Sequence, residues 1–226
     1  MITIEKTEVY GWEAAIRGIR NPMNSWDKSD TDFSLSGMQS VGGILVPTIG
    51  DNDLDLMKRL AQGGAVHAKY RRMITVTCDI TAPLYWWKEF DTYKVGTVAN
   101  SCSTMHKIHA KEFTLDDFSC EHLFDGVNRV EGESDMEYWD NPTGVLEYIV
   151  NVLNHYRLKF LDTNDKRFWW QMIQLLPTSY NQKRTVQMNY EVLVGMFRDR
   201  KNHKLDEWHT VCDWIRGLPY SELITG

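Results

Sequence analysis

The segment from Met73 to His106 contains the residues best suited to ligand chemistry. Its first eight residues favour a strand, and Pro83 suits the first turn of a following helix because proline has no backbone donor. A small polar run comes next, from Asn100 to Thr104. We expect this run to form a loop, so that its hydroxyl, amide and backbone N–H groups are not used by a strand ladder and can contact a ligand.

Cys102, in this polar run, is a candidate for nucleophilic or metal chemistry. A cysteine there is reactive only if its pKa is lowered, and the alternative, which we favour, is a small residue without a chemical role. Metal binding would use this thiol together with other residues of ligand type, namely His106, His109, Cys120 and His122. No established zinc pattern has this spacing, so we predict that the chain binds no metal.

Charge limits the classes of partner. The 226 residues carry a formal net charge of −6, and nucleic-acid binding needs a clustered positive field, so we expect no nucleic-acid partner. A few local cations can still hold the phosphate of a nucleotide. The only dense basic cluster in the first half of the chain is Lys69, Arg71 and Arg72.

The N-terminal half alternates between regular elements and one long polar segment. Residues 1–11 alternate apolar and polar residues and predict a strand, and residues 12–20 predict a short helix. Residues 21–50 are rich in Ser, Asp and Gly and predict a long functional or mobile loop. Asp51 can cap a helix that Gly63 and Gly64 end.

The C-terminal half favours helices. Asn141 and Pro142 open one helix with Val145, Ile149, Leu153 and Tyr156 on its buried face, and Asp165 starts another. Val186, Tyr190, Leu193 and Phe197 recur at helical spacing as far as Arg200, and a last helix has Trp208, Val211, Cys212 and Ile215. The acidic segment 131–140 is expected to be exposed. These patterns predict an α/β fold, with α+β as the other possibility, in one domain of residues 1–226.

The chain shows no targeting or membrane signal. Its N-terminal residues lack the apolar core of a signal peptide, and no apolar run is long enough to span a bilayer. The four cysteines form no Cys-x-x-Cys pair. We therefore expect a cytoplasmic protein with reduced thiols and no membrane partner.

Two stretches resemble the flavin-dependent thymidylate synthases. In that family Ala-Pro and a short helix precede Arg-His-Arg-x-x-Ser-x-Asn-Glu-x-Ser-x-Arg-Tyr; with Ala82-Pro83 as anchor, residues 92–105 align with this motif without a gap, although almost every signature residue is changed. Downstream, Leu176-Pro177 is followed at the family's spacing by Asn189 and Arg200. His67 falls on a family histidine.

The resemblance implies a fold, a reaction and a set of partners. It implies a central sheet with flanking helices in a homotetramer with shared sites. The activity would be one-carbon transfer from methylene-tetrahydrofolate to dUMP, with FAD as cofactor and NADPH as reductant. Arg200 would be catalytic and would also bind the pyrimidine nucleotide; its alternative is a solvated arginine at a helix C-terminus. The other substrate-binding residues would be Lys88, Glu89, Asn100, Cys102 and Thr104. The cofactor-binding residues would be His67, Lys69, Arg72, Tyr93, Lys94 and Asn189.

Several departures from the motif leave the substrate open. Thr104 and Ile173 stand where the family has arginines that contact the nucleotide, and Lys88 and Lys94 keep the charge of family arginines without their forked geometry. Arg167, Lys183 and Arg184 are nearby candidates for the phosphate. One alternative is a relative that modifies another pyrimidine nucleotide, and another is a flavin- or nucleotide-binding protein without catalysis.

Overall fold

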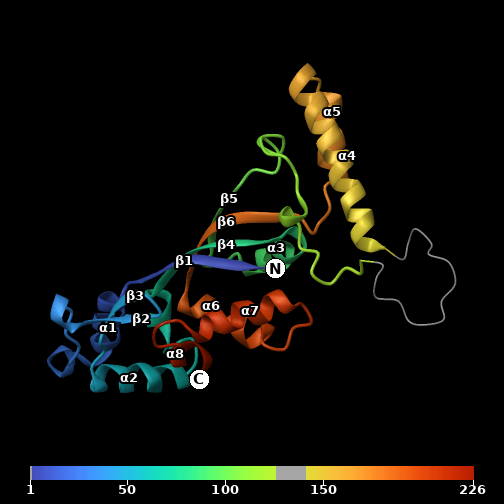
Figure 1. Ribbon diagram of the computed structural model, residues 1–226. Helices are drawn as coiled ribbons and strands as arrows, with labels where there is room; N and C mark the ends of the chain where they lie inside the picture. Colours follow the sequence, from blue (N-terminus) through green and yellow to red (C-terminus); the bar gives the residue numbers. More distant parts are fainter. Residues whose placement is uncertain (1, 126–140) are drawn as a thin grey trace, which may run out of the picture. The chain divides into compact units, whose positions relative to one another are not determined.

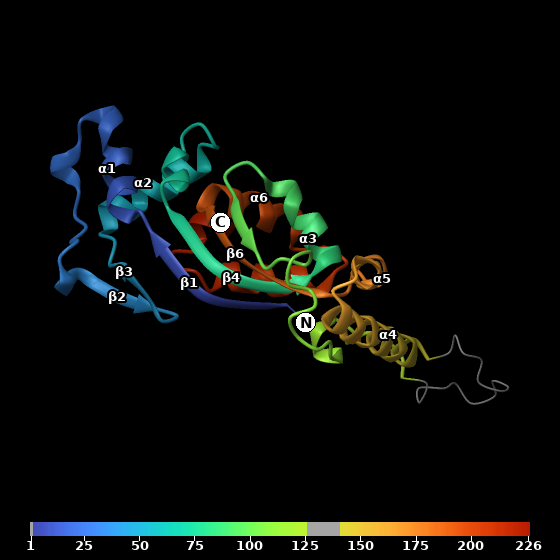
Figure 2. The same ribbon diagram turned by 90° about the horizontal axis from the view of Figure 1, so that it is seen from above.

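A computed structural model describes residues 2–125 and 141–226 (Figures 1 and 2). Contacts within the chain divide it into two compact units. The sheet unit consists of Ile2–Ile80, Phe90–Asn100 and Arg184–Gly226, and the helical unit consists of Thr81–Glu89 and the described part of Ser101–Lys183. The acidic segment predicted to be exposed, 131–140, lies outside the described residues. The single-domain organisation stays a prediction.

The larger sheet has four strands in the order β1-β4-β6-β5. Their bounds are β1 (Thr3–Tyr10), β4 (Thr75–Pro83), β5 (Val98–Ser101) and β6 (Asn181–Asn189). In β4 every second side chain is buried, from Val76 through Cys78 to Ile80, as expected for a strand with one face in the core. Burial raises the pKa of the Cys78 thiol to about 12, which makes this cysteine inert near neutral pH.

Three C-terminal helices pack together in the sheet unit and lie along one face of its strands (Figure 1). They are α6 (Tyr190–Arg200), α7 (Asp206–Arg216) and α8 (Glu222–Thr225). Helix α6 begins directly after β6, and Tyr190 N–H donates to the Ile74 carbonyl at 3.1 Å. Tyr190, Leu193 and Trp208 are fully buried, and their apolar surface fixes the helices on the sheet.

The N-terminal part of the sheet unit confirms the first predicted strand and helix. It contains α1 (Trp12–Arg20) and α2 (Asp51–Gln62). The predicted loop 21–50 is wrong in part, because it contains an antiparallel hairpin of β2 (Met38–Val41) and β3 (Ile44–Pro47). Gly42 and Gly43 both have positive φ and supply the two-residue turn. Strands of four residues are too short to show a clear period.

The helical unit contains α4 (Pro142–Thr163), α5 (Lys166–Leu175) and most of α3 (Leu84–Phe90). The last residue of α3, Phe90, belongs to the sheet unit. Helices α4 and α5 are confirmed, with the side chains of Asn141 and Asp165 accepting hydrogen bonds at their N-termini. The predicted buried face of α4 is confirmed at Leu153, which is in the core, and at Ile149 and Tyr156, which pack against it. Val145 is only partly buried, and Leu146 and Val150 belong to the core as well. Met172 of α5 completes this core with Phe113 and Phe118.

Four local predictions are corrected. Residues 181–189 form β6, so Val186 lies in a strand rather than in the predicted helix. The spacing of four between the buried Val186 and Tyr190 fits a helix, but it also fits one face of a strand, where buried residues recur at every second position. Asp51 is the first helical residue rather than the cap. Pro83 ends β4 instead of opening α3. The polar run is not entirely a loop, because its first residues end β5.

The mixed α/β class itself is confirmed. No helix in the described part of the chain is long and apolar enough to cross a membrane.

Candidate functional site

A short turn, η4 (Lys69–Arg72), contributes residues to two pockets of the sheet unit. Tyr70 anchors the turn, because its hydroxyl donates to the Met57 carbonyl at 2.9 Å and its ring is buried. Burial raises the pKa of Tyr70 to about 12, so it remains a neutral donor. Arg71 is buried as well, whereas Lys69 and Arg72 are exposed. Each of these two exposed cations lines one pocket.

The first pocket, called the His67 pocket, has a volume of about 840 Å³. It lies between the end of α1, helix α2 and the residues that precede β4. Two predicted cofactor-binding residues, His67 and Lys69, line it together with Lys28 and Arg59. Its apolar lining residues are Ile19, Met23, Leu56, Leu60, Val66 and Met73. This combination can hold a ligand that joins flat rings to anionic groups.

The second pocket, called the Asn189 pocket, has a volume of about 520 Å³. It brings together Arg72, Tyr93 and Asn189, three of the predicted cofactor-binding residues. Asn189 is the N-cap of α6, and its Oδ1 accepts from Val192 N–H at 3.0 Å. A Cβ at Gly96 would lie 3.2 Å from Asn189 Nδ2, and Gly96 has φ of 82°, so glycine allows this close approach.

Glu191 is a pocket residue that the sequence analysis missed. It lines the Asn189 pocket from the first turn of α6, where the helix dipole favours a carboxylate. Its Oε2 lies 4.0 Å from Nη1 of the buried Arg71. The available sequence signal was its position two residues after Asn189, at the start of a helix.

Arg200 is held by aromatic side chains. Its Nε donates to the Tyr93 hydroxyl at 2.9 Å, and its guanidinium carbon lies 4.7 Å from the centre of the Trp208 ring and 5.5 Å from that of Tyr93. These contacts orient the planar cation and leave it partly buried, unlike a freely solvated helix-end arginine. Its neighbours Arg198 and Asp199 line the Asn189 pocket.

Lys94 and Asn100 lie elsewhere in the sheet unit. Lys94 lines a small cavity of about 100 Å³ with Tyr93 and Thr97. Asn100 is exposed on β5. These two predicted site residues are therefore not among those that line the His67 or Asn189 pocket.

The remaining predicted substrate residues belong to the helical unit. Lys88 and Glu89 lie on α3, and Cys102 and Thr104 follow β5. Cys102 is exposed, but its N–H donates to the Lys183 carbonyl at 2.9 Å and its carbonyl accepts from Gln182 Nε2 at 2.7 Å. The polar run was predicted to keep its backbone groups free for a ligand, and this prediction is wrong at Cys102.

The possible metal ligands do not form a cluster in the described residues. Across residues 2–125 and 141–226, no three His, Cys, Asp or Glu side chains lie close enough together to hold a metal ion. The His109 ring packs edge-on against Phe160, with their centres 4.9 Å apart. Packing of this kind is typical of a structural histidine.

Solved structures resemble the whole chain, although no protein-family model and no curated protein matches its sequence. Thymidylate synthase X (ThyX) from Helicobacter pylori, solved with FAD and dUMP, gives a TM-score of 0.62 at 14% identity, covering 100% of this chain and 97% of that one. The UMP/dUMP methylase PolB from Streptomyces cacaoi, bound with 5-Br dUMP, gives 0.62 at 15% identity, covering 100% and 95%. At these identities the likeness concerns the fold. The chain therefore has a ThyX-like fold.

Proposed function

We propose that this protein is a flavin-dependent enzyme that transfers a one-carbon unit from methylene-tetrahydrofolate to dUMP, giving dTMP, with NADPH as reductant. The observation that carries the proposal is the His67 pocket, in which two of the six predicted cofactor-binding residues, His67 and Lys69, lie together within a ThyX-like fold. The solved ThyX structures contain FAD and dUMP, which supports the same pair of ligands here.

The His67 pocket fits FAD by size and by chemistry. Its volume of about 840 Å³ suits a cofactor. Lys69, Lys28 and Arg59 supply cations for a diphosphate, and His67 supplies a ring nitrogen and a flat surface. Apolar side chains from α1 and α2 supply contacts for the rings. When bound, the flavin would supply the redox chemistry of the transfer.

The residues of the chain would bind and orient the reactants. Arg200, fixed by Tyr93 and Trp208, would place a permanent positive charge beside a carbonyl oxygen of the pyrimidine and polarise it. Asn189 and Arg72 would supply an amide and a cation at the Asn189 pocket. We also expect a homotetramer with shared sites, which light scattering of the purified protein will test.

The first test is flavin binding. Purified protein is expected to show flavin absorbance, or to gain it on adding FAD. Lys69→Ala should weaken FAD binding about tenfold, because a charge-assisted hydrogen bond contributes about 1.5 kcal/mol. Lys58→Ala removes an exposed lysine of α2 that pairs with Glu222, and it should leave the affinity unchanged. A folded protein that binds no FAD would refute the proposal.

The second test is turnover with dUMP and with UMP. A specific observation favours UMP as a second candidate substrate, since PolB is a UMP/dUMP methylase and the present chain lacks two family arginines for the nucleotide. Product methylated at C5, formed only with folate and NADPH present, would establish the enzyme and its substrate. FAD binding without turnover on any pyrimidine nucleotide would identify a binding protein instead.

Cys102→Ser is expected to keep at least about a tenth of the activity, a barrier change below about 1.4 kcal/mol. An alcohol ionises far less than a thiol near neutral pH, so a nucleophilic cysteine would make this change severe. Cys102 is exposed, and its hydrogen bonds to Lys183 and Gln182 use its backbone N–H and carbonyl, which the change to serine keeps. Both observations agree with a mild effect. Single-turnover rates with flavin and nucleotide bound provide the measurement, and complete loss would show cysteine chemistry.

A further inference from the structure

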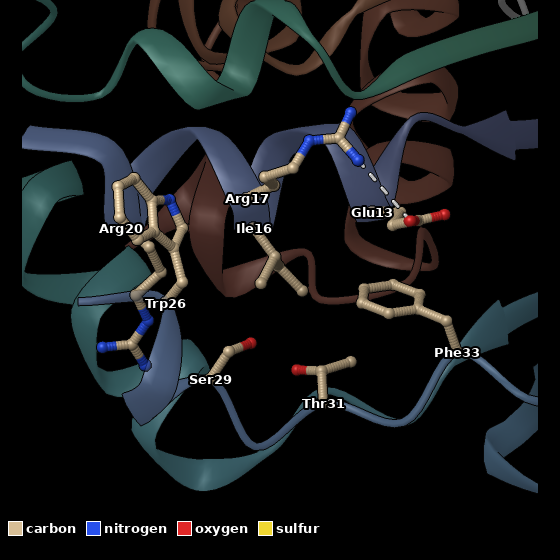
Figure 3. Close-up of a pocket in the computed structure, with 8 residues that line it drawn as sticks. All are labelled: Glu13, Ile16, Arg17, Arg20, Trp26, Ser29, Thr31 and Phe33. Carbon is tan, nitrogen blue, oxygen red and sulfur yellow. Dashed lines mark ion pairs between the residues drawn. The ribbon is translucent and has the colours of Figure 1, made fainter. Parts of the chain in front are cut away.

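A second candidate binding site lies between α1 and the segment from Trp26 to Phe33. Its volume is about 420 Å³. Figure 3 shows Trp26 and Phe33 at its two ends, Ile16 pointing in from α1, and Ser29 and Thr31 on the opposite segment. We call it the Trp26 pocket. Arg20 is the one residue in the lining of both this pocket and the His67 pocket.

The floor of the Trp26 pocket is fixed by a buried carboxylate. Asp53 is fully buried, and its Oδ2 accepts from Ser29 Oγ at 2.8 Å and from Thr31 Oγ1 at 2.7 Å. The same oxygen accepts from the backbone N–H groups of Asp30 and Thr31, both at 3.1 Å. A pocket held in this way is formed before a ligand arrives, so binding orders few groups and costs less entropy.

The floor presents hydrogen-bond acceptors. Each hydroxyl uses its single proton on Asp53, and Thr31 Oγ1 also accepts from Gly50 N–H at 3.0 Å. A hydroxyl oxygen has two lone pairs, so Ser29 keeps both and Thr31 keeps one. The floor therefore suits a ligand that carries donors, such as an exocyclic amine or ribose hydroxyls.

Trp26 offers an oriented aromatic face. Its Nε1 donates to Asn21 Oδ1 at 2.8 Å, which sets the direction of the indole, yet 52% of the residue surface is exposed. A large aromatic side chain held in solvent beside a pocket can stack a flat ring, and stacking accepts any base because every base has a π-face.

Arg17 supplies a positive charge at the rim. Its side chain is 64% exposed and pairs with Glu13 at 3.5 Å, and the carboxylate is exposed as well. An exposed ion pair of this kind contributes little to stability, so Arg17 can leave Glu13 and bind an anionic ligand group with little loss of free energy. An arginine fork suits a phosphate in particular.

We propose that the Trp26 pocket binds a nucleoside monophosphate, with the base on Trp26, donors toward Ser29 and Thr31, and the phosphate at Arg17. This site is additional to the proposed flavin and substrate sites. The probe is adenosine 5′-monophosphate, titrated by calorimetry into protein saturated with FAD, so that the His67 pocket is filled. Adenosine lacks the phosphate and ribose 5-phosphate lacks the base, and each should bind at least about fivefold more weakly.

Variants test the location. Trp26→Leu is expected to weaken binding about tenfold, Trp26→Phe about threefold or less because a ring remains, and Arg17→Gln about fivefold with a smaller salt dependence. The matched controls are Trp170→Leu, at an exposed tryptophan of the helical unit, and Arg216→Gln, at an exposed arginine of α7 that pairs with Asp213, and both should leave the affinity unchanged. Melting temperatures confirm that each variant is folded.

The proposal is overturned if no binding is seen up to about 10 mM. It is also overturned if Trp26→Leu and Arg17→Gln bind like the wild type, or if the three probes bind equally. If the protein takes up no FAD, the titration is run on the Lys69→Ala protein. Binding that still depends on Trp26 and Arg17 supports the Trp26 pocket even though the flavin proposal has failed.

Discussion

Arg200→Lys is expected to lower kcat by about 100-fold, the usual cost of losing one oriented group that stabilises developing charge. The guanidinium donates through Nε to Tyr93 and lies over Trp208, and this contact directs the rest of the fork. Lysine has a single nitrogen and cannot hold Tyr93 and a pyrimidine carbonyl with the same geometry. FAD affinity should stay within about threefold, because the His67 pocket is unchanged.

Steady-state kinetics with the preferred nucleotide, together with flavin titration, provide the measurement. The matched control is Arg216→Lys, which changes an arginine that also lies over an aromatic ring, 5.0 Å from the centre of Phe197. It should leave kcat within about twofold. A fall in melting temperature with unchanged turnover in Arg200→Lys would mean that the arginine only supports the packing of α6 against α7.

Asp53→Asn is expected to lower the free energy of unfolding by about 3 kcal/mol, because it leaves the charge of Arg20 buried without its counter-ion. Arg20 donates through Nε to Asp53 Oδ1 at 2.8 Å, and its Nη2 lies 2.7 Å from the same oxygen. For a chain of this length the change corresponds to a fall in melting temperature of roughly 6–12 °C. Thermal unfolding followed by circular dichroism measures it.

The effect of Asp53→Asn should depend on pH. Burial by itself would raise the pKa of Asp53, but hydrogen bonds from Thr31, Ser29 and Arg20 and the charge of Arg20 outweigh it and lower the pKa. A carboxyl with a lowered folded-state pKa stabilises the fold above its unfolded-state pKa and loses that contribution as pH falls through the folded-state value. The difference in the free energy of unfolding between wild type and variant should therefore be largest near neutral pH and become smaller in acid.

Asp55→Asn is the matched control on the same helix. Asp55 pairs with Arg59 at 2.8 Å, but both side chains are 65% exposed, and the change should cost less than about 1 kcal/mol. An equal loss in the two variants would show that burial of the Arg20–Asp53 pair contributes nothing special. Because Arg59 lines the His67 pocket, only unfolding is compared with this control.

Local signals in the sequence determined several elements. The alternation before Gly11 gave β1, and the capping residues Asn141 and Asp165 gave the starts of α4 and α5. These signals are local, because a strand period, a proline or a cap acts within a few residues. β6 was missed for the same reason, since Val186 and Tyr190, four residues apart, fit one face of a helix as well as one face of a strand until the neighbouring strands are known.

The sequence also determined which residue types the site could use. The family resemblance singled out His67 and Lys69, and the structure gives them one pocket; it singled out Arg72, Tyr93 and Asn189, and these share another. Spacing along the chain could not show that Lys94 and Asn100 are absent from the linings of both pockets, because that depends on the path of the chain after α3.

Only the tertiary structure decided how the long segment after α1 is held. Asp53 and Arg20 are 33 residues apart, and Asp30 caps α2 from a distant loop by accepting from Asn52 N–H at 2.9 Å. Read alone, Asp51 was the natural cap, because the sequence shows only the residues next to a helix. A buried carboxylate can be recognised only when the chain that surrounds it is folded, since its partners are then fixed by distance and not by sequence order.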